Sequence, residues 1–326
     1  MSMNVRVIGT GSALPAQVWT NEALIAAKGF ESSDEWIQTR TGIRQRYIVS
    51  EGETTFTLAR DAVVKAIESA GIERSQVGVL IVATCTPDLT FPSVAALVHG
   101  DLGLAPNCVV LDVNAACSGF VHGLAVARGL MLAGSAGYAV VVGAETFSNL
   151  MDWNDRTTSV LFGDGAGAVV LKKEEAAAKA GILAIEMGAD GSCAPYLQSS
   201  AGVARGKVAG VVLMNGREVY KHAVRQMGSK DEAQKLLDVA GLSVEDVDWM
   251  VPHQANLRII EASAQSVGIA LEKVVVTVDQ HANTSAATIP LALDVAVRDG
   301  RIKAGDVVML QAFGAGFAWS GALLKW

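Results

Sequence analysis

Two hydrophobic patterns alternate along the whole chain. Short continuous apolar runs, such as the one that ends at Val109–Asp112, are typical of buried strands. Other stretches carry apolar residues three or four positions apart, such as Phe120, Leu124 and Ala127, and are typical of helices that bury one face. This alternation over 326 residues predicts an α/β fold built in layers.

The patterns also repeat, in the same order, in the two halves of the chain. The segment Ala70–Thr84 resembles Ala240–Gln254, the segment around Asp112 resembles the one around Asp279, and "AGYAVVVGA" resembles "AGDVVMLQA". The offsets between these pairs lie between 167 and 170 residues, which is far too long for a solenoid repeat. They predict an internal duplication, with two similar α/β halves packed about a pseudo-twofold axis.

We expect residues 1–173 to form the N-terminal half and residues 174–326 the C-terminal half. The junction would lie within Leu171–Ala184, a polar stretch that predicts a solvent-exposed helix between two strands. Residues 188–218 are rich in Gly and Ser and predict loops with one short hairpin.

Composition excludes several functional classes. The formal net charge of −7 argues against a general nucleic-acid-binding protein. No apolar run approaches the roughly 20 residues of a membrane-spanning helix, and the N-terminus lacks the pattern of a signal peptide. The four cysteines have no CxxC spacing, so we expect neither a disulfide framework nor a metal site. A cytoplasmic protein without membrane contact is the expectation.

Cys117 follows a predicted buried strand and precedes a predicted helix, and two interpretations of it are open. A cysteine in an apolar stretch is most often a small core residue, which is our interpretation of the other three cysteines. Around Cys117, however, alanines, Ser118 and Gly119 leave space for a ligand. A helix N-terminus also favours the thiolate and would lower the thiol pKa from about 8.5 toward neutrality, as a nucleophile requires.

Two further reactive side chains are predicted at the same edge of the fold. His253 follows the strand-like run "VDWMVP" in a polar cluster with Gln254 and Asn256. Asn283 lies one residue before Thr284, which the internal alignment pairs with Cys117. The edge at which the strands end is where open α/β sheets usually bind ligands. A Cys-His-Asn site is therefore the main hypothesis from the residues alone.

The motifs that carry these three residues resemble those of the β-ketoacyl-ACP synthase III family. They are "DVNAACSGF", "VPHQANLRII" and "HANTSAATIP", accompanied by "DEWIQTRTGIRQR", "FGDGAGAVVL" and "FGAGFAWSGALL". The resemblance extends from about residue 5 to Trp326. It implies a duplicated, thiolase-like, five-layer α/β/α/β/α fold and an acyltransferase that initiates type II fatty acid synthesis.

The resemblance also implies a two-stage reaction. Cys117 would take the acyl group from an acyl-CoA, and malonyl-ACP would then lose CO2 and attack the acyl-enzyme. His253 Nε2–H and the Asn283 amide would stabilise the malonyl enolate, and the backbone N–H groups of Cys117 and Ala315 would form the oxyanion hole. The thioesters are substrates, and no cofactor or metal is implied.

Basic residues are implied to bind both substrates. Trp36, Arg40 and Arg156 would hold CoA, with an indole and a guanidinium stacking on the adenine. Acyl carrier protein would dock on a basic rim that consists of Arg217, Lys221, Arg225 and Arg258. The first three lie four residues apart and share one face of a predicted helix, which could equally be an ordinary solvated surface. The chain departs from the family pattern at Gln265 and Ser266, where many relatives carry lysines, and at Arg217, where Asn is common.

The resemblance further implies a homodimer in which Phe91 reaches the acyl pocket of the neighbouring subunit and favours acetyl-CoA over longer primers. Three alternatives stay open. The enzyme could use medium-chain primers or serve secondary metabolism, it could be a Cys-His-Asn hydrolase, or it could be a non-catalytic scaffold.

Overall fold

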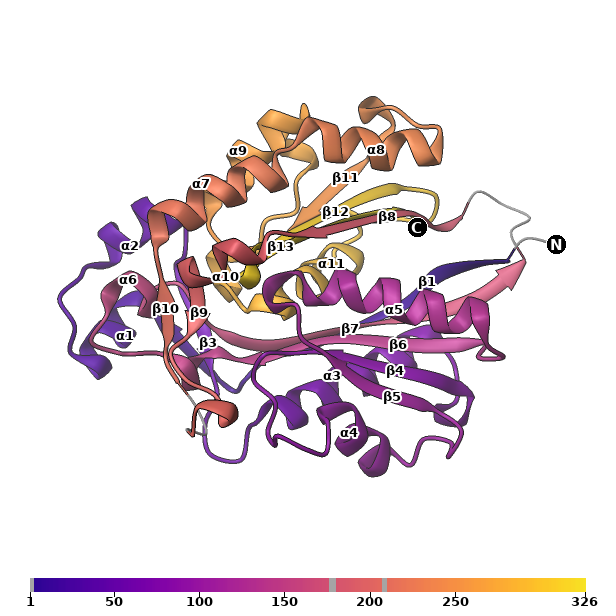
Figure 1. The fold of residues 1–326 in the computed structure, drawn as a ribbon, viewed down its shortest axis with the longest axis horizontal. Coiled ribbons are helices and arrows are strands. Elements are labelled where there is room, and N and C mark those ends of the chain that lie inside the picture. The colour runs from indigo at the N-terminus through magenta and orange to yellow at the C-terminus, as the bar shows by residue number, and fades with distance from the viewer. Residues whose placement is uncertain (1–2, 176–179, 207–209) are drawn as a thin grey trace.

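A computed structural model describes residues 3–175, 180–206 and 210–326 as five stacked layers (Figure 1). The first sheet has five strands, in the order β1 (Met3–Ala13), β7 (Asp164–Glu175), β6 (Tyr138–Thr146), β4 (Val77–Ala83) and β5 (Val109–Val113). The second sheet has four strands, in the order β8 (Gly181–Ala189), β13 (Ala318–Lys325), β12 (Val307–Gly314) and β11 (Trp249–Pro252).

The strand directions confirm the predicted duplication. In the first sheet β1, β7 and β6 are antiparallel neighbours, and β6, β4 and β5 are parallel ones. In the second sheet β8, β13 and β12 are antiparallel, and β12 and β11 are parallel. A parallel bridge between Met250 and Val274 lies where a fifth strand would pair. Both sheets therefore share one topology.

Helices form the other three layers. The first sheet is covered outside by α3 (Thr55–Ala70) and α4 (Val94–Leu102), and the second by α8 (Lys230–Ala240) and α9 (Leu257–Val267) (Figure 1). Between the sheets lie α5 (Gly119–Ala133) and α11 (Thr288–Arg298), which contact strands of both sheets. The apolar segment Ala116–Ala133 is long enough to cross a membrane, but half of it is buried, and its helix is this central one. The predicted α/β/α/β/α layering is confirmed.

The two central helices begin with the same unusual turn. Each follows a 3₁₀ turn, Ala116–Ser118 or Ser285–Ala287, whose first residue has a positive φ, 47° for Ala116 and 50° for Ser285. These two residues are therefore structural equivalents. Cys117 corresponds to Ala286 rather than to Thr284, because the sequence match was displaced by two residues in this turn.

The predicted helix at the junction is wrong at both ends of Leu171–Ala184, the parts that the structure describes. Residues up to Glu175 extend strand β7, because their backbone pairs with β1, and β8 begins at Gly181. The stretch between them includes residues 176–179, which lie outside the described residues. The predicted hairpin is present as β9 (Leu197–Ser199) and β10 (Val212–Met214).

Smaller elements surround the ligand-binding edge of the sheets. They are β2 (Gln17–Thr20), β3 (Gln45–Ile48), α1 (Asn21–Lys28), α2 (Asp34–Thr41), α6 (Arg156–Ser159), α7 (Gly216–Met227) and α10 (Val278–His281).

Candidate active site

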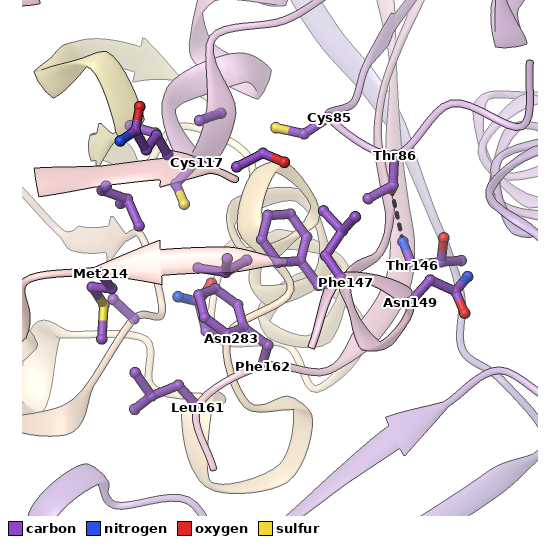
Figure 2. Close-up of a pocket in the computed structure, with 18 of the residues that line it drawn as sticks. Cys85, Thr86, Cys117, Thr146, Phe147, Asn149, Leu161, Phe162, Met214 and Asn283 are labelled. Atoms are coloured by element: carbon purple, nitrogen blue, oxygen red, sulfur yellow. Dashed lines mark hydrogen bonds between the residues drawn. The ribbon is translucent and has the colours of Figure 1, made fainter. Parts of the chain in front are cut away.

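A single cavity of about 1180 Å³ brings the predicted reactive residues together. Cys117, His253, Asn283 and Ala315 all line it, although they come from both halves of the chain. The cavity extends from Trp36 at the surface past these residues to an apolar wall. Figure 2 shows the Cys117 sulfur pointing into this space, with Phe147 and Phe162 stacked at 4.8 Å between ring centres in the wall.

Cys117 is 7% exposed, at the turn between β5 and α5. Burial, with a smaller contribution from the charge of Glu145, raises the pKa of its thiol to about 12. The expected lowering toward neutrality is therefore wrong for the free protein, because loss of hydration outweighs the helix N-terminus. A group that accepts the thiol proton is needed before Cys117 can act as a nucleophile at neutral pH.

His253 follows β11 and is held in a dry environment. Its backbone N–H donates to Gln311 O at 2.7 Å, and its Nδ1 lies 2.7 Å from Thr288 Oγ1. Burial lowers the pKa of His253 to about 3, so the imidazole is neutral at physiological pH. Thr288 Oγ1 also lies 3.0 Å from Ser285 O. The Thr288 hydroxyl can donate its proton either to His253 Nδ1 or to that carbonyl. If it donates to Nδ1, the imidazole hydrogen is on Nε2, and if it donates to the carbonyl, it can accept from Nδ1–H.

The backbone of Asn283 is fixed on both sides. Its N–H donates to Leu161 O, and its carbonyl accepts from the Gly163 N–H, both at 3.0 Å. Its side-chain Oδ1 accepts from the Ser285 N–H at 2.8 Å. Because the oxygen is engaged inside the protein, the NH2 group is the end of the amide that can donate to a ligand.

The polar cluster after His253 has a structural task. The Gln254 amide donates to Pro252 O and Val275 O, and its oxygen accepts from the N–H groups of Thr277 and Val278. Asn256 caps α9 and donates to Arg40 O at 3.0 Å. These bonds hold the His253 and Asn283 loops together and connect them to α2.

At the cavity mouth, the three predicted CoA-binding residues are in contact. The Arg40 guanidinium carbon lies 4.8 Å from the centre of the Trp36 ring, and that of Arg156 lies 5.2 Å from it. Arg258 donates to Thr39 O at 2.8 Å beside them. The arrangement concentrates positive charge around a flat aromatic surface.

Helix α7 has two different faces. Val219, Ala223 and Met227 line the cavity. The predicted docking residues Arg217, Lys221 and Arg225 are exposed on the other side, and Lys221 lies 3.8 Å from Glu218. One helix thus forms both a cavity wall and a basic surface.

Phe91 takes no part in the cavity of its own chain. It is 84% exposed, whereas its neighbours Leu89 and Thr90 line the cavity.

Three polar residues of the site were missed by the sequence analysis: Glu145, Ser285 and Thr288. Glu145 is fully buried, and its carboxylate accepts from the Cys85 N–H at 3.0 Å and from Thr86 Oγ1 at 2.6 Å. Burial raises the pKa of Glu145 to about 7. A carboxylate that directly follows the apolar run "YAVVVGA" was the signal that could have found it. Among the described residues, no group of three His, Cys, Asp or Glu could hold a metal ion.

The sequence matches two family models. Residues 111–191 match 3-oxoacyl-[acyl-carrier-protein] synthase III, and residues 237–326 match the C-terminal part of 3-oxoacyl-[acyl-carrier-protein] synthase III. A β-ketoacyl-[acyl-carrier-protein] synthase III from Rhizorhabdus wittichii is 54% identical over 323 residues, which cover 98% of each chain.

Two crystal structures have similar folds. The 3-oxoacyl-[acyl-carrier-protein] synthase III from Aquifex aeolicus is 42% identical with a TM-score of 0.91, covering 99% of this chain and 100% of that one. The priming β-ketosynthase of the R1128 polyketide biosynthetic pathway is 34% identical, also with a TM-score of 0.91, covering 98% and 96%.

Proposed function

The chain belongs to the β-ketoacyl-[acyl-carrier-protein] synthase III family, thiolase-like acyltransferases that initiate fatty acid synthesis, and from this premise we propose how its residues divide the reaction. Cys117 carries the acyl group, and His253 and Asn283 activate malonyl-ACP. The convergence of these three side chains in one cavity carries the proposal.

In the first stage, the sulfur of Cys117 attacks the carbonyl carbon of an acyl-CoA. The bond from that carbon to the CoA sulfur breaks, and CoA leaves with a proton. The transient oxyanion is stabilised by the backbone N–H groups of Cys117 and Ala315, which both line the cavity. Burial strengthens these interactions because no water competes for the oxyanion.

In the second stage, malonyl-ACP loses CO2, and the resulting carbanion attacks the acyl-Cys117 carbonyl carbon. The bond from that carbon to the Cys117 sulfur breaks, so that 3-oxoacyl-ACP leaves and the Cys117 thiol is restored. Negative charge develops on the malonyl thioester oxygen, where the Asn283 NH2 group can donate a hydrogen bond. A neutral His253 can donate as well if its proton is on Nε2, which requires the Thr288 hydroxyl to donate to Nδ1. Two neutral donors stabilise the enolate without protonating it.

The cavity mouth is proposed to bind the carriers of both thioesters. Trp36, Arg40 and Arg156 offer an aromatic face and two cations to the adenine and phosphates of CoA. The exposed cations of α7, together with Arg258, offer a docking surface for an acidic acyl carrier protein. The chemistry needs no cofactor, because both reactants arrive as thioesters.

We propose a cytoplasmic homodimer. Strand β5 is an edge of the first sheet, its backbone groups are open for pairing, and Val109 is 44% exposed on it. Pairing of two β5 strands would protect this edge and bring the exposed Phe91 toward the partner. Light scattering should give the mass of a dimer, and an active monomer would contradict this. The repeat of the strand topology supports two halves that meet between β7 and β8, so the proposed boundary after residue 173 falls near the end of β7, which runs to Glu175.

The favoured primer is acetyl-CoA, on the expectation that Phe91 closes the partner's acyl pocket. Priming with a medium-chain acyl group, or a role in secondary metabolism, is the second candidate, and the fold shared with the polyketide-priming synthase supports the latter. Mass spectrometry of the protein after incubation with a panel of acyl-CoAs tests both. An acetyl mass on Cys117 at the highest rate is expected, and a strong preference for octanoyl-CoA would overturn the assignment.

A further inference from the structure

Lys28, the last residue of α1, lies between two indole rings. Its Nζ is 4.4 Å from the centre of the Trp153 ring and 5.7 Å from the centre of the Trp19 ring. Trp19 belongs to β2, and Trp153 belongs to the loop that precedes α6. Both distances are within the roughly 6 Å at which an ammonium is attracted to an aromatic ring. The lysine therefore connects α1 to the loop before α6.

Helix α6 needs such contacts to keep its place. It has four residues and begins at Arg156, directly after the loop that contains Trp153. A helix this short is not fixed by its own hydrogen bonds. Its C-terminal end is anchored, because the buried Arg46 donates to Val160 O at 2.6 Å. Lys28 holds the segment at the opposite end, where Arg156 lies.

Arg156 contacts the same pair of helices. Its Nη1 donates to Glu31 O, in the link between α1 and α2, at 2.9 Å, and its guanidinium lies 5.2 Å from the Trp36 ring centre on α2. Helices α1, α2 and α6 lie together at one end of the molecule (Figure 1). The segment Trp153–Arg156 is thus attached to the α1–α2 unit at both of its ends. A displacement of Trp153 would carry Arg156 away from Trp36.

The simplest role for Lys28 is to stabilise the C-terminus of α1, where a cation interacts favourably with the helix dipole. That role needs the charge alone and not two indoles. Trp19, Trp36 and Trp153 all pack against one buried apolar cluster, which holds the rings in place. Lys28 and Arg156 are exposed, and each lies against rings that this cluster supports. The cations are therefore placed by the rings beneath them.

We propose that Lys28 is a positioning residue for acyl-CoA binding, because through the Trp153 ring it fixes the place of Arg156 at the cavity mouth. The inference rests on the proposed function, in which Arg156 and Trp36 bind the adenine and phosphates of CoA. Without Lys28, the place of Arg156 would have to be restored at each binding event, which weakens binding. The cost falls on the KM for acyl-CoA and not on kcat, since Cys117 lies deeper in the cavity.

The test compares acetyl-CoA with acetyl-pantetheine, a thioester that lacks the adenine and the phosphates, as primers for condensation with malonyl-ACP by the full chain. Lys28→Met should raise KM for acetyl-CoA by about fivefold, the loss expected for an exposed cation–π contact. It should leave kcat and the KM for acetyl-pantetheine unchanged. Lys28→Arg should restore KM, because a guanidinium also binds indole faces. The matched control is Lys303→Met, an exposed lysine before the far end of β12, which should behave as wild type.

An Arg156→Ala background shows whether Lys28 acts through Arg156. In that background Lys28→Met should raise KM for acetyl-CoA no further, because residues that act as one unit are not additive. Trp153→Leu should reproduce the effect of Lys28→Met, and if it fails to fold, the Arg156→Ala background decides alone.

Three results would overturn the inference. They are a wild-type KM for acetyl-CoA in Lys28→Met, an equal rise in KM for acetyl-pantetheine, and losses that multiply when Lys28→Met and Arg156→Ala are combined. The last would mean that Lys28 attracts the CoA phosphates directly. If Arg156→Ala itself kept the wild-type KM for acetyl-CoA, or the wild type did not use acetyl-CoA, the proposed function would fail instead.

Discussion

Gly314→Ala is expected to disable the oxyanion hole while leaving the reactive side chains in place. Gly314 ends β12 directly before Ala315, and its backbone is in the extended region that any residue adopts. Backbone strain therefore plays no part. A Cβ at this position would lie 2.7 Å from Cys117 N, 3.1 Å from Ser118 N and 3.2 Å from Ala115 O, all of them backbone atoms.

The magnitude follows from these contacts. Ordinary van der Waals contact begins near 3.4 Å, so the Cys117 amide would have to move by roughly 0.7 Å relative to Gly314. Such a shift moves a donor from about 2.9 to about 3.6 Å from the oxyanion, beyond a hydrogen bond. Loss of one oxyanion donor costs about 10²–10³ in rate, or about 3–4 kcal/mol.

The assay is single-turnover acylation of Cys117 by acetyl-CoA, measured beside thermal unfolding. The matched control is Gly129→Ala, at an exposed glycine inside α5 where an added Cβ meets no atom within 4 Å. The control should acylate normally and gain up to about 1 kcal/mol of stability from helix propensity. If folded Gly314→Ala acylates within threefold of wild type, Cys117 N–H and Ala315 N–H do not form the hole as argued.

Four further outcomes are expected. Asn283→Ala should retain primer transfer and lose malonyl-ACP decarboxylation by about 10²–10³-fold, whereas Cys117→Ala should form no acyl adduct but still release CO2; the opposite pattern would reverse the roles. Thr288→Val should slow decarboxylation and Thr288→Ser should not, with ¹⁵N shifts of His253 reporting the loss of Nε2–H; an unchanged tautomer would contradict this. Unfolded His253 binds a proton below pH 6.5, whereas the folded residue binds one only near pH 3. The free energy of unfolding should therefore fall by about 1.4 kcal/mol per pH unit as pH falls through that window. Denaturant unfolding of His253→Asn should lack this pH-dependent loss. Lys221→Glu should raise KM for malonyl-ACP but not for acetyl-CoA, and equal effects on both would exclude a docking role.

Local sequence determined the elements and the positions of the reactive residues within them. Alternation of apolar runs and helical spacing is a property of neighbouring residues, so it predicted the α/β class without knowledge of the packing. The internal repeat placed Cys117, His253 and Asn283 at the ends of predicted strands or at the entrances of the following helices, and these positions meet at one edge of a duplicated fold. The convergence of the three residues could therefore be predicted from the sequence alone.

The tertiary structure decided the chemistry of those residues. Cys117 has a raised pKa because the surrounding layers exclude water, which outweighs the local helix terminus. Thr288 became the partner of His253, and the Cys85 N–H a donor to Glu145, through contacts between residues 35 and 60 positions apart. Pairing with β1 likewise made Lys172–Glu175 a strand against their polar pattern. Burial and long-range contact arise from how distant segments pack, and a pattern of neighbouring residues does not contain them.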